Sequence, residues 1–425
     1  MGWISGLLLL TFIFMGLPVA FALAVAAAVF MWWSGVPQQV FVQRLVLGVD
    51  SFPLLAIPFF ILAGNLMSSG GITVRIFRLA HALVGHIRGG MGHVSVVANM
   101  IMAGMSGSAI ADAAGLGPLA IESMRRSGYP KDLAAAIMAA GATIGPIIPP
   151  SIIMVIYATS AGGVSVAKLF LGGIGVGVLM GLSLMMIVWF KARQMAVPSP
   201  WTGWRDLAVA FKEAILATIT PVLIIGGILS GVFTPTESAA VAAFYAMLLG
   251  AFVYRELTLK KLLEVLSESM LTTSVVFTIM AATSAFGWIL AFARVPQAIA
   301  ETLSALTSSP LLMLVLLMAI YFYLGTIMEA VAIVIVTVPI VMPVLEKLSI
   351  DPVHFGVLLA VNVSIGTLTP PVGLVMFVIC GIAKLSIEEF TRAAWPFIAA
   401  LVACLALAMV FPETVLLIPR LVLGR

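Results

Sequence analysis

Apolar runs long enough to cross a membrane recur along the whole chain of 425 residues. Hydrophobic residues make up 62% of the sequence and charged residues only 9%, and the mean hydropathy is +1.22. A bilayer admits only helices or closed barrels, because every backbone polar group must find its hydrogen bond within the protein. The runs are too long and continuous for barrel strands, so the sequence predicts an all-α polytopic membrane protein.

Nine of these runs are predicted as membrane spans. The first is too long for a signal-peptide core and lacks a cleavage pattern, so we expect it to be retained. Two further runs each carry a small or polar cluster midway, "GMSGSA" and "GTIMEA", and are predicted as re-entrant hairpins. The spans are 4–32, 52–69, 132–160, 168–190, 214–232, 237–254, 268–293, 353–383 and 394–418, and the hairpins are 91–121 and 310–345.

The distribution of basic residues predicts the orientation. With both hairpins treated as re-entrant, 15 Lys and Arg residues fall in one set of loops and 6 in the opposite set. The richer side should be cytoplasmic. We therefore expect a bacterial or archaeal cytoplasmic (inner) membrane protein with a cytoplasmic N-terminus and a periplasmic C-terminus.

The stretch "GATIGPIIPPS" at 141–151 has an echo 221 residues later, "VSIGTLTPPVG" at 363–373. The same offset pairs Gly104 with Gly325 and Pro118 with Pro339. An odd number of crossings between the halves makes this an inverted-topology repeat with two discontinuous helices, an arrangement typical of secondary transporters. The predicted parts are a first repeat over 1–190 (hairpin 91–121, broken helix 132–160), a linker, surface helix and connecting span over 191–232, and a second repeat over 233–425 (hairpin 310–345, broken helix 353–383).

Broken helices present bare carbonyls and positive helix ends to the same spot, which suits a small hard cation and an anion. Each half offers such oxygens at its hairpin tip and its helix break, so we expect two similar sodium sites. The alternative is that the hydroxyls merely bond to carbonyls of their own helices. The candidates are Gly104, Ser106, Ser108, Gly141 and Thr143 in the first half, and Gly325, Thr326, Asn362, Ser364, Gly366 and Thr369 in the second.

Acidic residues within apolar segments are functional candidates, because ionisable groups are expensive at membrane depth. Asp112 and Glu329 lie near the two tips and are possible coupling acids. Glu237 is expected instead to start a span, with Thr234 or Thr236 as its helix cap. Sodium is the only metal that the pattern indicates, and it would act as the coupling ion, with no cofactor.

At these motifs the sequence closely resembles the large membrane subunit of tripartite ATP-independent periplasmic (TRAP) transporters. The resemblance implies an elevator-type transporter driven by a sodium gradient. It also implies an organic-acid substrate (a C4-dicarboxylate, sialic acid or a related carboxylate), a periplasmic binding protein that delivers it, and a separate small four-helix membrane subunit. The stretches that carry it are "AIPFFILAGNLM" (56–67), "SGSAIADAAGLG" (106–117), "GYPKDLAAAI" (128–137), "GPIIPPS" (145–151), "GVFTPTESAAVAAFYA" (231–246), "DPVHFG" (351–356) and "GTLTPPVG" (366–373).

The family's tips and breaks fall on the regions already selected from the residues. The resemblance places the substrate between the two tips, touched by residues near Ser108, Pro150, Ser151, Thr326 and Pro371. We expect a transporter with no enzymatic activity, no catalytic residue and no nucleic-acid partner.

Two rivals stay open at this point. A single-component sodium symporter for divalent anions or citrate would share hairpins and inverted repeats but need no binding protein. A more remote alternative is a rhomboid-like intramembrane serine protease, since "GMSG" at 104–107 matches a GxSG motif with Ser106 as nucleophile.

Overall fold

The computed structural model describes residues 7–424, apart from residue 10, residues 13–14 and residues 193–199. All regular secondary structure in this part of the chain is helical. Eight of its helices are long and apolar enough to cross a membrane, which confirms a multi-pass α-helical protein.

The helices of the two halves have the following bounds. The first half contains α2 (Val19–Trp33), α3 (Gln38–Leu47), η1 (Phe52–Leu55), α4 (Ala56–Ser69), α5 (Ile72–Val84), α6 (Gly90–Ser106), α7 (Ala109–Arg126), α8 (Lys131–Ala142), α9 (Ile152–Ser160) and α10 (Val166–Ala192). After α11 (Trp204–Leu229) come α12 (Pro235–Leu248), the π-helix η2 (Leu249–Val253), α13 (Leu259–Phe292), α14 (Val295–Leu306), α15 (Pro310–Ile327), α16 (Ala330–Lys347), α17 (Pro352–Gly366), α18 (Leu374–Ala383), α19 (Ile387–Val410) and α20 (Glu413–Leu423).

The offset of 221 residues relates helix bounds as well as sequence letters. Adding 221 to the bounds of α7 gives 330 and 347, which are the bounds of α16. Adding it to the first residue of α10 gives 387, the start of α19. The two cis peptide bonds, Pro149–Pro150 and Pro370–Pro371, also lie 221 residues apart. The second half therefore repeats the backbone of the first.

The structure confirms helix breaks where the sequence predicts them. Helix α8 ends at Ala142 and α9 begins at Ile152, while α17 ends at Gly366 and α18 begins at Leu374. Between α6 and α7 the chain turns at Gly107, whose φ of +62° suits a residue without a Cβ. Between α15 and α16 it leaves helical geometry at Met328 and Glu329. These four breaks create the ends on which the site is built.

Three predicted spans differ from the structure. In the described part of 4–32, the long helix begins only at Val19, because Gly16 has φ +86° and Pro18 has no N–H to donate. The run 394–418 is divided between α19 and α20, since the chain leaves the helix at Phe411 and Pro412. The predicted surface helix and connecting span form one helix, α11, and linker residues 193–199 lie outside the described residues.

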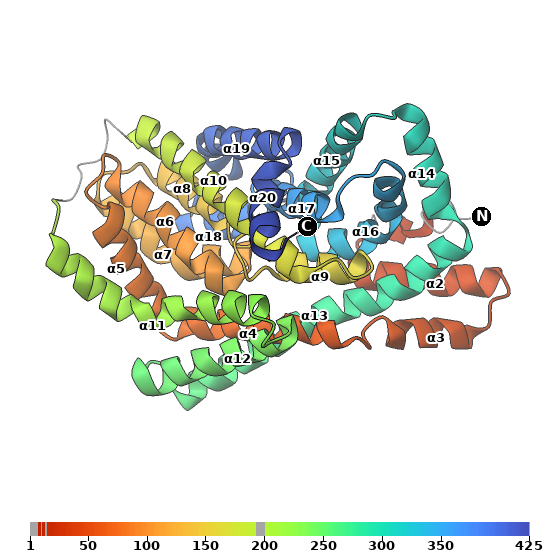
Figure 1. Cartoon of the computed structure of the whole chain (residues 1–425), viewed down its shortest axis with the longest axis horizontal. Coiled ribbons are helices and arrows are strands. Elements are labelled where there is room, and N and C mark those ends of the chain that lie inside the picture. The colour runs from red at the N-terminus through yellow and green to blue at the C-terminus, as the bar shows by residue number, and fades with distance from the viewer. Residues whose placement is uncertain (1–6, 10, 13–14, 193–199, 425) are drawn as a thin grey trace.

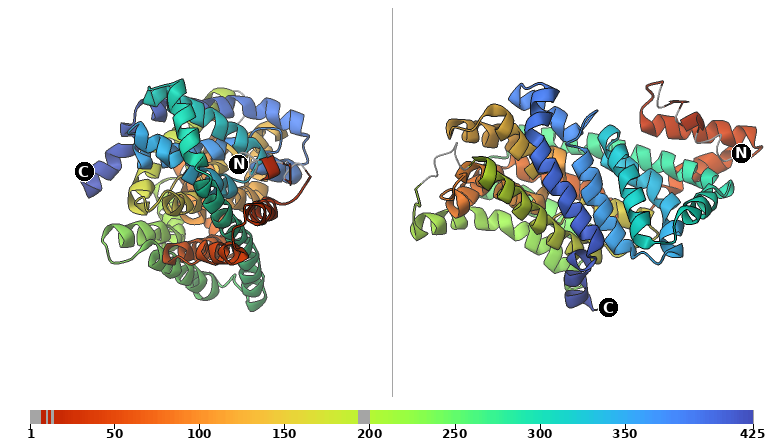
Figure 2. Two further views of the ribbon diagram at one scale, coloured as in Figure 1. Left: turned by 90° about the vertical axis from the view of Figure 1, so that its right-hand side faces the viewer. Right: turned by 90° about the horizontal axis from the view of Figure 1, so that it is seen from above.

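The helices form two groups, which Figures 1 and 2 show from three directions. The frame helices α2, α3, α4, α11, α12 and α13 run along the lower part of Figure 1, with α13 packed against α2, α3 and α4. The core helices, α6–α10 and α15–α19, lie above them. Within the core the halves interlock, because α16 packs against α9 and α7 packs against α18.

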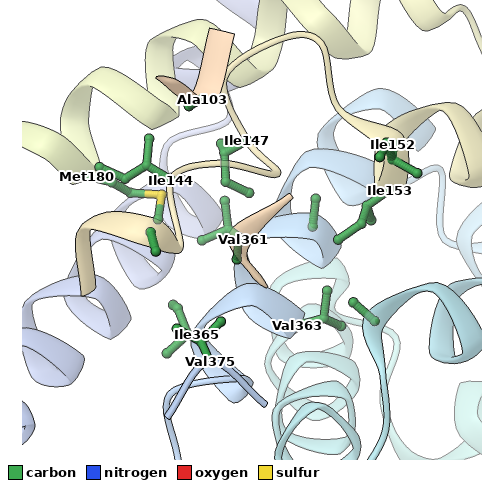
Figure 3. Packing of buried hydrophobic residues seen from close by; sticks show 14 of the residues in the cluster. Ala103, Ile144, Ile147, Ile152, Ile153, Met180, Val361, Val363, Ile365 and Val375 are labelled. Carbon is green, nitrogen blue, oxygen red and sulfur yellow. The ribbon is translucent and has the colours of Figure 1, made fainter. Parts of the chain in front are cut away.

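Buried hydrophobic side chains fill the space between the two interruptions. Figure 3 shows part of this cluster, with Ile144 and Ile147 from the first interruption and Val361 and Ile365 from α17. All four side chains are fully buried. The interruptions are thus embedded in packed protein, where non-helical backbone is tolerated at membrane depth.

Candidate functional site

Each tip lies against a helix interruption at very short range. A Cβ built on Gly107 would lie 2.6 Å from the Pro150 carbonyl oxygen. A Cβ built on Gly366 would lie 2.6 Å from the Gly325 carbonyl carbon. Only glycine permits these approaches, so the tips and interruptions form two compact junctions.

A cavity of about 690 Å³ opens beside both junctions, and we name it the central cavity. Its size is within the usual range for small-molecule sites. The core contributes both tips and both interruptions, and the frame contributes one face each of α4 and α13. The lining includes Ser106, Gly107, Ser108, Pro146, Ile153, Glu329, Ser364 and Thr367 from the core, and Asn65, Ser68, Ser69, Glu268 and Thr272 from the frame.

Asp112 lies at the first junction and is completely buried. Its Oδ2 atom points at the interruption, where a Cβ built on Gly145 would lie 2.5 Å away. The Ser106 hydroxyl lies beside the carboxyl group, yet neither carboxylate oxygen makes a hydrogen bond of normal geometry within the described residues. A buried carboxylate without partners is costly, and a bound cation would offset that cost.

Glu329 is the acidic residue of the second junction, and in the repeat it corresponds to Ser108 rather than to Asp112. Its carboxylate Oε2 accepts a hydrogen bond from the Ala332 N–H at 3.2 Å and so caps α16. In the first half, the Ser108 hydroxyl caps α7 by accepting from the Ala111 N–H at 3.4 Å. Unlike Asp112, Glu329 is exposed and lines the central cavity.

Two buried asparagines supply further acceptors without partners. The Asn362 amide nitrogen donates to the Met318 carbonyl oxygen at 2.6 Å, and the Asn99 amide nitrogen donates to the Ser95 carbonyl oxygen at 2.8 Å. The Oδ1 atoms of both residues are buried and have no hydrogen-bond partner among the described residues. Amide oxygens of this kind are good ligands for hard cations.

Four of the predicted sodium residues donate their hydroxyl protons to carbonyl groups of their own helices. Thr143 and Ser364 each donate to a carbonyl oxygen at 2.7 Å, Thr326 donates at 2.8 Å, and Thr369 donates at 3.2 Å. This is the arrangement expected for hydroxyls that only satisfy helix carbonyls. A hydroxyl that donates its proton still keeps lone pairs, so the same geometry also allows the oxygen to contact a cation.

The structure divides the predicted residues into two sets. Ser106, Ser108, Glu329 and Ser364 line the central cavity. The others are not among its lining residues; Ser151, for example, caps α9, and its hydroxyl donates to the Pro146 carbonyl oxygen. This second set is Gly104, Gly141, Thr143, Pro150, Ser151, Gly325, Thr326, Asn362, Gly366, Thr369 and Pro371, together with Asp112.

The ionisable side chains in the described lining of the central cavity are all acidic. Its described lining residues include two carboxylates, Glu268 and Glu329, and no Lys, Arg or His. An anionic ligand placed here would meet repulsion unless cations accompanied it. The cavity therefore suits an anion together with cations, or a ligand rich in hydrogen-bond donors.

Sequence reasoning missed Asn99, Glu268 and Asn65. A signal for Asn99 existed, because an asparagine inside the apolar run "VSVVANMIM" needs a polar partner at membrane depth. Glu268 and Asn65 belong to frame helices, which the sequence does not place against the tips. The expected cap at Glu237 is confirmed, since Thr234 and Glu237 form a reciprocal capping box.

Comparisons with known proteins agree with this architecture. The family model of the DctM component of tripartite ATP-independent periplasmic transporters matches residues 7–414. The sialic acid TRAP transporter large permease protein SiaM of Vibrio cholerae is 43% identical over 425 residues, with 100% of this chain and 98% of the relative covered. The 2,3-diketo-L-gulonate TRAP transporter large permease protein YiaN of Escherichia coli is 41% identical, with 95% of each chain covered.

A further relative and a solved structure extend the comparison. The C4-dicarboxylate TRAP transporter large permease protein DctM of Pseudomonas aeruginosa is 40% identical, with 87% of each chain covered. The YdaH transporter of Alcanivorax borkumensis has a similar fold, with a TM-score of 0.64, 16% identity and 87% coverage of both chains. The relatives share the permease role but differ in the acid that their names specify.

Proposed function

This chain belongs to the DctM family of TRAP transporter large permeases, and from that premise we propose that it imports an organic acid by sodium-coupled secondary transport. It is a transporter permease rather than an enzyme, as are its named relatives. The protease alternative is therefore wrong. A partnered transporter also accounts for the family better than a single-component symporter does.

The observation that carries the sodium proposal is the set of buried oxygens without partners around an acidic cavity. Asp112 and the two asparagines Asn99 and Asn362 leave four such oxygens beside the two interruptions. A sodium ion at each junction would satisfy these acceptors and add positive charge beside the substrate. Asp112, Asn99 and the Ser106 and Thr143 hydroxyls would serve the first ion, and Asn362, Ser364 and Thr326 the second.

The same arrangement supports an inverted repeat with two re-entrant hairpins. Glu268 and Asn65 lie toward the ends of α13 and α4 that adjoin basic residues, Lys260 and Lys261 in the first turn of α13 and Arg75 in α5. If these basic residues are cytoplasmic, the central cavity faces the cytoplasm. Movement of the core along the frame would then carry the tips toward the other side, which is the elevator mechanism that we propose.

Substrate and partners follow from the family. We propose that a periplasmic binding protein delivers a carboxylate such as sialic acid, a sugar acid or a C4-dicarboxylate. A small membrane subunit would complete the permease. The carboxylate would lie between Ser108 and Glu329, held by helix N-termini and by the sodium ions rather than by a basic side chain.

Uptake into proteoliposomes tests this proposal. The chain is reconstituted with its small subunit, and the binding protein is added outside with radiolabelled sialic acid, a hexuronic acid or succinate. We expect uptake of one of these acids only when the binding protein is present and the sodium concentration outside the proteoliposomes exceeds that inside. Replacing sodium with choline should abolish uptake.

A proton gradient without sodium is the matched control. If uptake is indifferent to sodium and follows the proton gradient, the sodium assignment is wrong, and Asp112 and Glu329 become the coupling groups. If uptake does not need the binding protein, the single-component alternative is correct.

A further inference from the structure

A second cavity lies on the other side of the interface between frame and core. Its volume is about 360 Å³, and its described lining residues are all different from those of the central cavity. Along α13, residues between Glu268 and Ile279 line the central cavity, and residues between Met280 and Ala291 line the second one. The same frame helix therefore serves two cavities in succession.

The internal repeat relates the lining of the two cavities. Adding 221 to Ser51 and Leu54 of the second cavity gives Thr272 and Val275 of the central cavity. Subtracting 221 from Ile335 and Val336 of the second cavity gives Ala114 and Gly115 of the central one. Phe286 and Leu290 correspond in the same way to Asn65 and Ser69.

Part of the central cavity is its own counterpart under the same offset. Ser108 corresponds to Glu329, Pro146 to Thr367 and Ile153 to Leu374, and all six residues line it. The central cavity thus consists of a symmetric part at the tips and an asymmetric arm between α4, α7 and α13. Six lining residues of the second cavity thus correspond to residues of that arm.

The second cavity also contains polar groups without partners. The Thr283 hydroxyl oxygen is buried and has no hydrogen-bond partner among the described residues, and Thr283 is 6% exposed. Pro339 has no N–H to donate to the Ile335 carbonyl, and both residues line the cavity. Ser51, Thr159, Ser160 and Ser284 add further hydroxyl groups. The Thr283 hydroxyl without a partner favours a polar occupant, which a purely lipidic environment does not provide.

Charge distinguishes the two cavities. The described lining of the second cavity contains no ionisable side chain, whereas the central cavity has Glu268 and Glu329. An anion therefore meets no fixed negative charge in the second cavity and does meet it in the arm of the central cavity. This difference favours entry of an anion through the second cavity and its release through the arm.

We propose that the second cavity is the access vestibule through which the organic acid reaches the tips from the side opposite the open arm. Ser51, Thr283 and Ser284 would be its polar contacts on the frame. The inference rests on the proposed import function. When α9 and α16 move along α13, the second cavity joins the symmetric part and the present arm closes.

A matched cysteine pair tests the vestibule. Ser51→Cys and Thr272→Cys occupy repeat-related positions, one in each cavity, and each is made with Cys380→Ala and Cys404→Ala. A membrane-impermeant methanethiosulfonate is applied to one side of oriented vesicles at a time. We expect Cys at 272 to react with reagent applied to the side that carries Lys260, Lys261 and Arg75, and Cys at 51 to react with reagent applied to the opposite side. When sodium and substrate are varied, the labelling rate of one cysteine should rise as that of the other falls.

A wedge provides a second, independent variant. Gly287 lines the second cavity, and a Cβ built there meets no atom within 4 Å, so Gly287→Trp fits without a clash at its Cβ. We expect it to reduce uptake at least about tenfold while Thr272→Cys labelling in the same protein is unchanged. Gly226→Trp on α11, where a Cβ also has open space, is the control and should retain uptake.

The outcomes separate this inference from the proposed function. If the parent protein transports but Cys at 51 reacts from the same side as Cys at 272, or if Gly287→Trp transports normally, the vestibule assignment is wrong and import stands. If the parent protein and Gly226→Trp both fail to transport any tested acid with its binding protein, the proposed function fails.

Discussion

The two junctions share a backbone design and differ in how they place negative charge. At the first, Asp112 is fully buried against Gly145 and its oxygens lack partners within the described chain. At the second, position 333, which corresponds to Asp112, is a buried isoleucine, and the carboxylate of Glu329 instead caps α16 and faces the cavity. One acid faces inward to an interruption and the other faces the central cavity.

This comparison indicates that duplication preserves helix ends while the side chains specialise. The two asparagines illustrate it, because Asn362 lies on α17 whereas its repeat partner is Gly141, and the first half supplies Asn99 from α6 instead. A Cβ on Gly141 would lie 2.8 Å from the Asn99 amide nitrogen, so the glycine leaves room for the amide. Each junction thus has one buried amide, which comes from α6 at the first junction and from α17 at the second.

The largest effect is expected at Asp112. Asp112→Asn keeps the shape of the side chain but removes the negative charge that would face a sodium ion in the first junction. We expect sodium-driven uptake to fall by about 100-fold or more. Proteoliposome uptake at fixed binding-protein concentration measures it. Asp132→Asn, at the partly exposed first turn of α8, is the control, and equal losses in both variants would contradict a special role for Asp112.

Two glycine substitutions separate backbone contact from side-chain contact. In Gly366→Ala the new methyl group would meet Gly325 backbone atoms at 2.6 to 2.9 Å, which cannot move without separating α15 from α17. We expect a loss of stability of about 1–3 kcal/mol, seen as a lower unfolding temperature in detergent. In Gly145→Ala the nearest atom is the Asp112 side-chain oxygen, so uptake should suffer more than stability.

The opposite order of effects in these two variants would contradict this comparison of the junctions. If Gly145→Ala unfolds the protein while Gly366→Ala only lowers uptake, the first junction is the rigid one. Gly287→Ala, where a Cβ meets nothing within 4 Å, should change neither measurement.

Asn99 and Asn362 do not correspond under the offset of 221, yet we predict the same role for both at their junctions. Asn99→Leu and Asn362→Leu each remove a buried amide oxygen without a partner, and we expect each to raise the sodium concentration for half-maximal uptake by about tenfold. Asn65→Leu is the control, because the Asn65 amide donates to the Ser269 hydroxyl at 2.9 Å in the frame. An effect confined to Asn362→Leu would show that the first junction does not use Asn99.

The sequence predicts those parts of the fold that local chemistry determines. Prolines 149, 150, 370 and 371 lie at two of the breaks and Gly107, with its positive φ, lies at a third, so local chemistry made these three breaks predictable. The fourth, at Met328 and Glu329, was indicated by the polar cluster "GTIMEA" within an apolar run. The end of α19 at Phe411 and the late start of α2 were not, because an apolar run continues through both points. Hydropathy predicts which segments lie in the membrane, but it does not predict where a helix begins or ends within such a segment.

The candidate site was predictable only on the core side. Asp112, Ser108, Glu329 and Ser364 lie in motifs that repeat or interrupt helices, so their positions carry a local signal. Glu268 lines the same cavity as the tips because α13 packs against α16, a long-range contact that no local pattern encodes. The alignment of the two cavities by the offset of 221 likewise required helix bounds and lining residues together.

The smallest expected effect is at the paired hydroxyls of the interruptions. Thr143 and Ser364 correspond under the offset, and each donates to a carbonyl of its own helix at 2.7 Å. In Thr143→Val and Ser364→Ala the carbonyl remains bonded within its helix, so the loss is limited to contact between the hydroxyl oxygen and sodium. We expect the sodium concentration for half-maximal uptake to rise about twofold to tenfold in each variant, the change expected when an interaction as strong as one hydrogen bond is lost.

Thr159→Val is the control. It removes a comparable helix-bonded hydroxyl of α9 from the second cavity and should leave sodium dependence unchanged. If neither Thr143→Val nor Ser364→Ala shifts that dependence, these hydroxyls serve their helices only, and cation binding relies on Asp112 and the two asparagines.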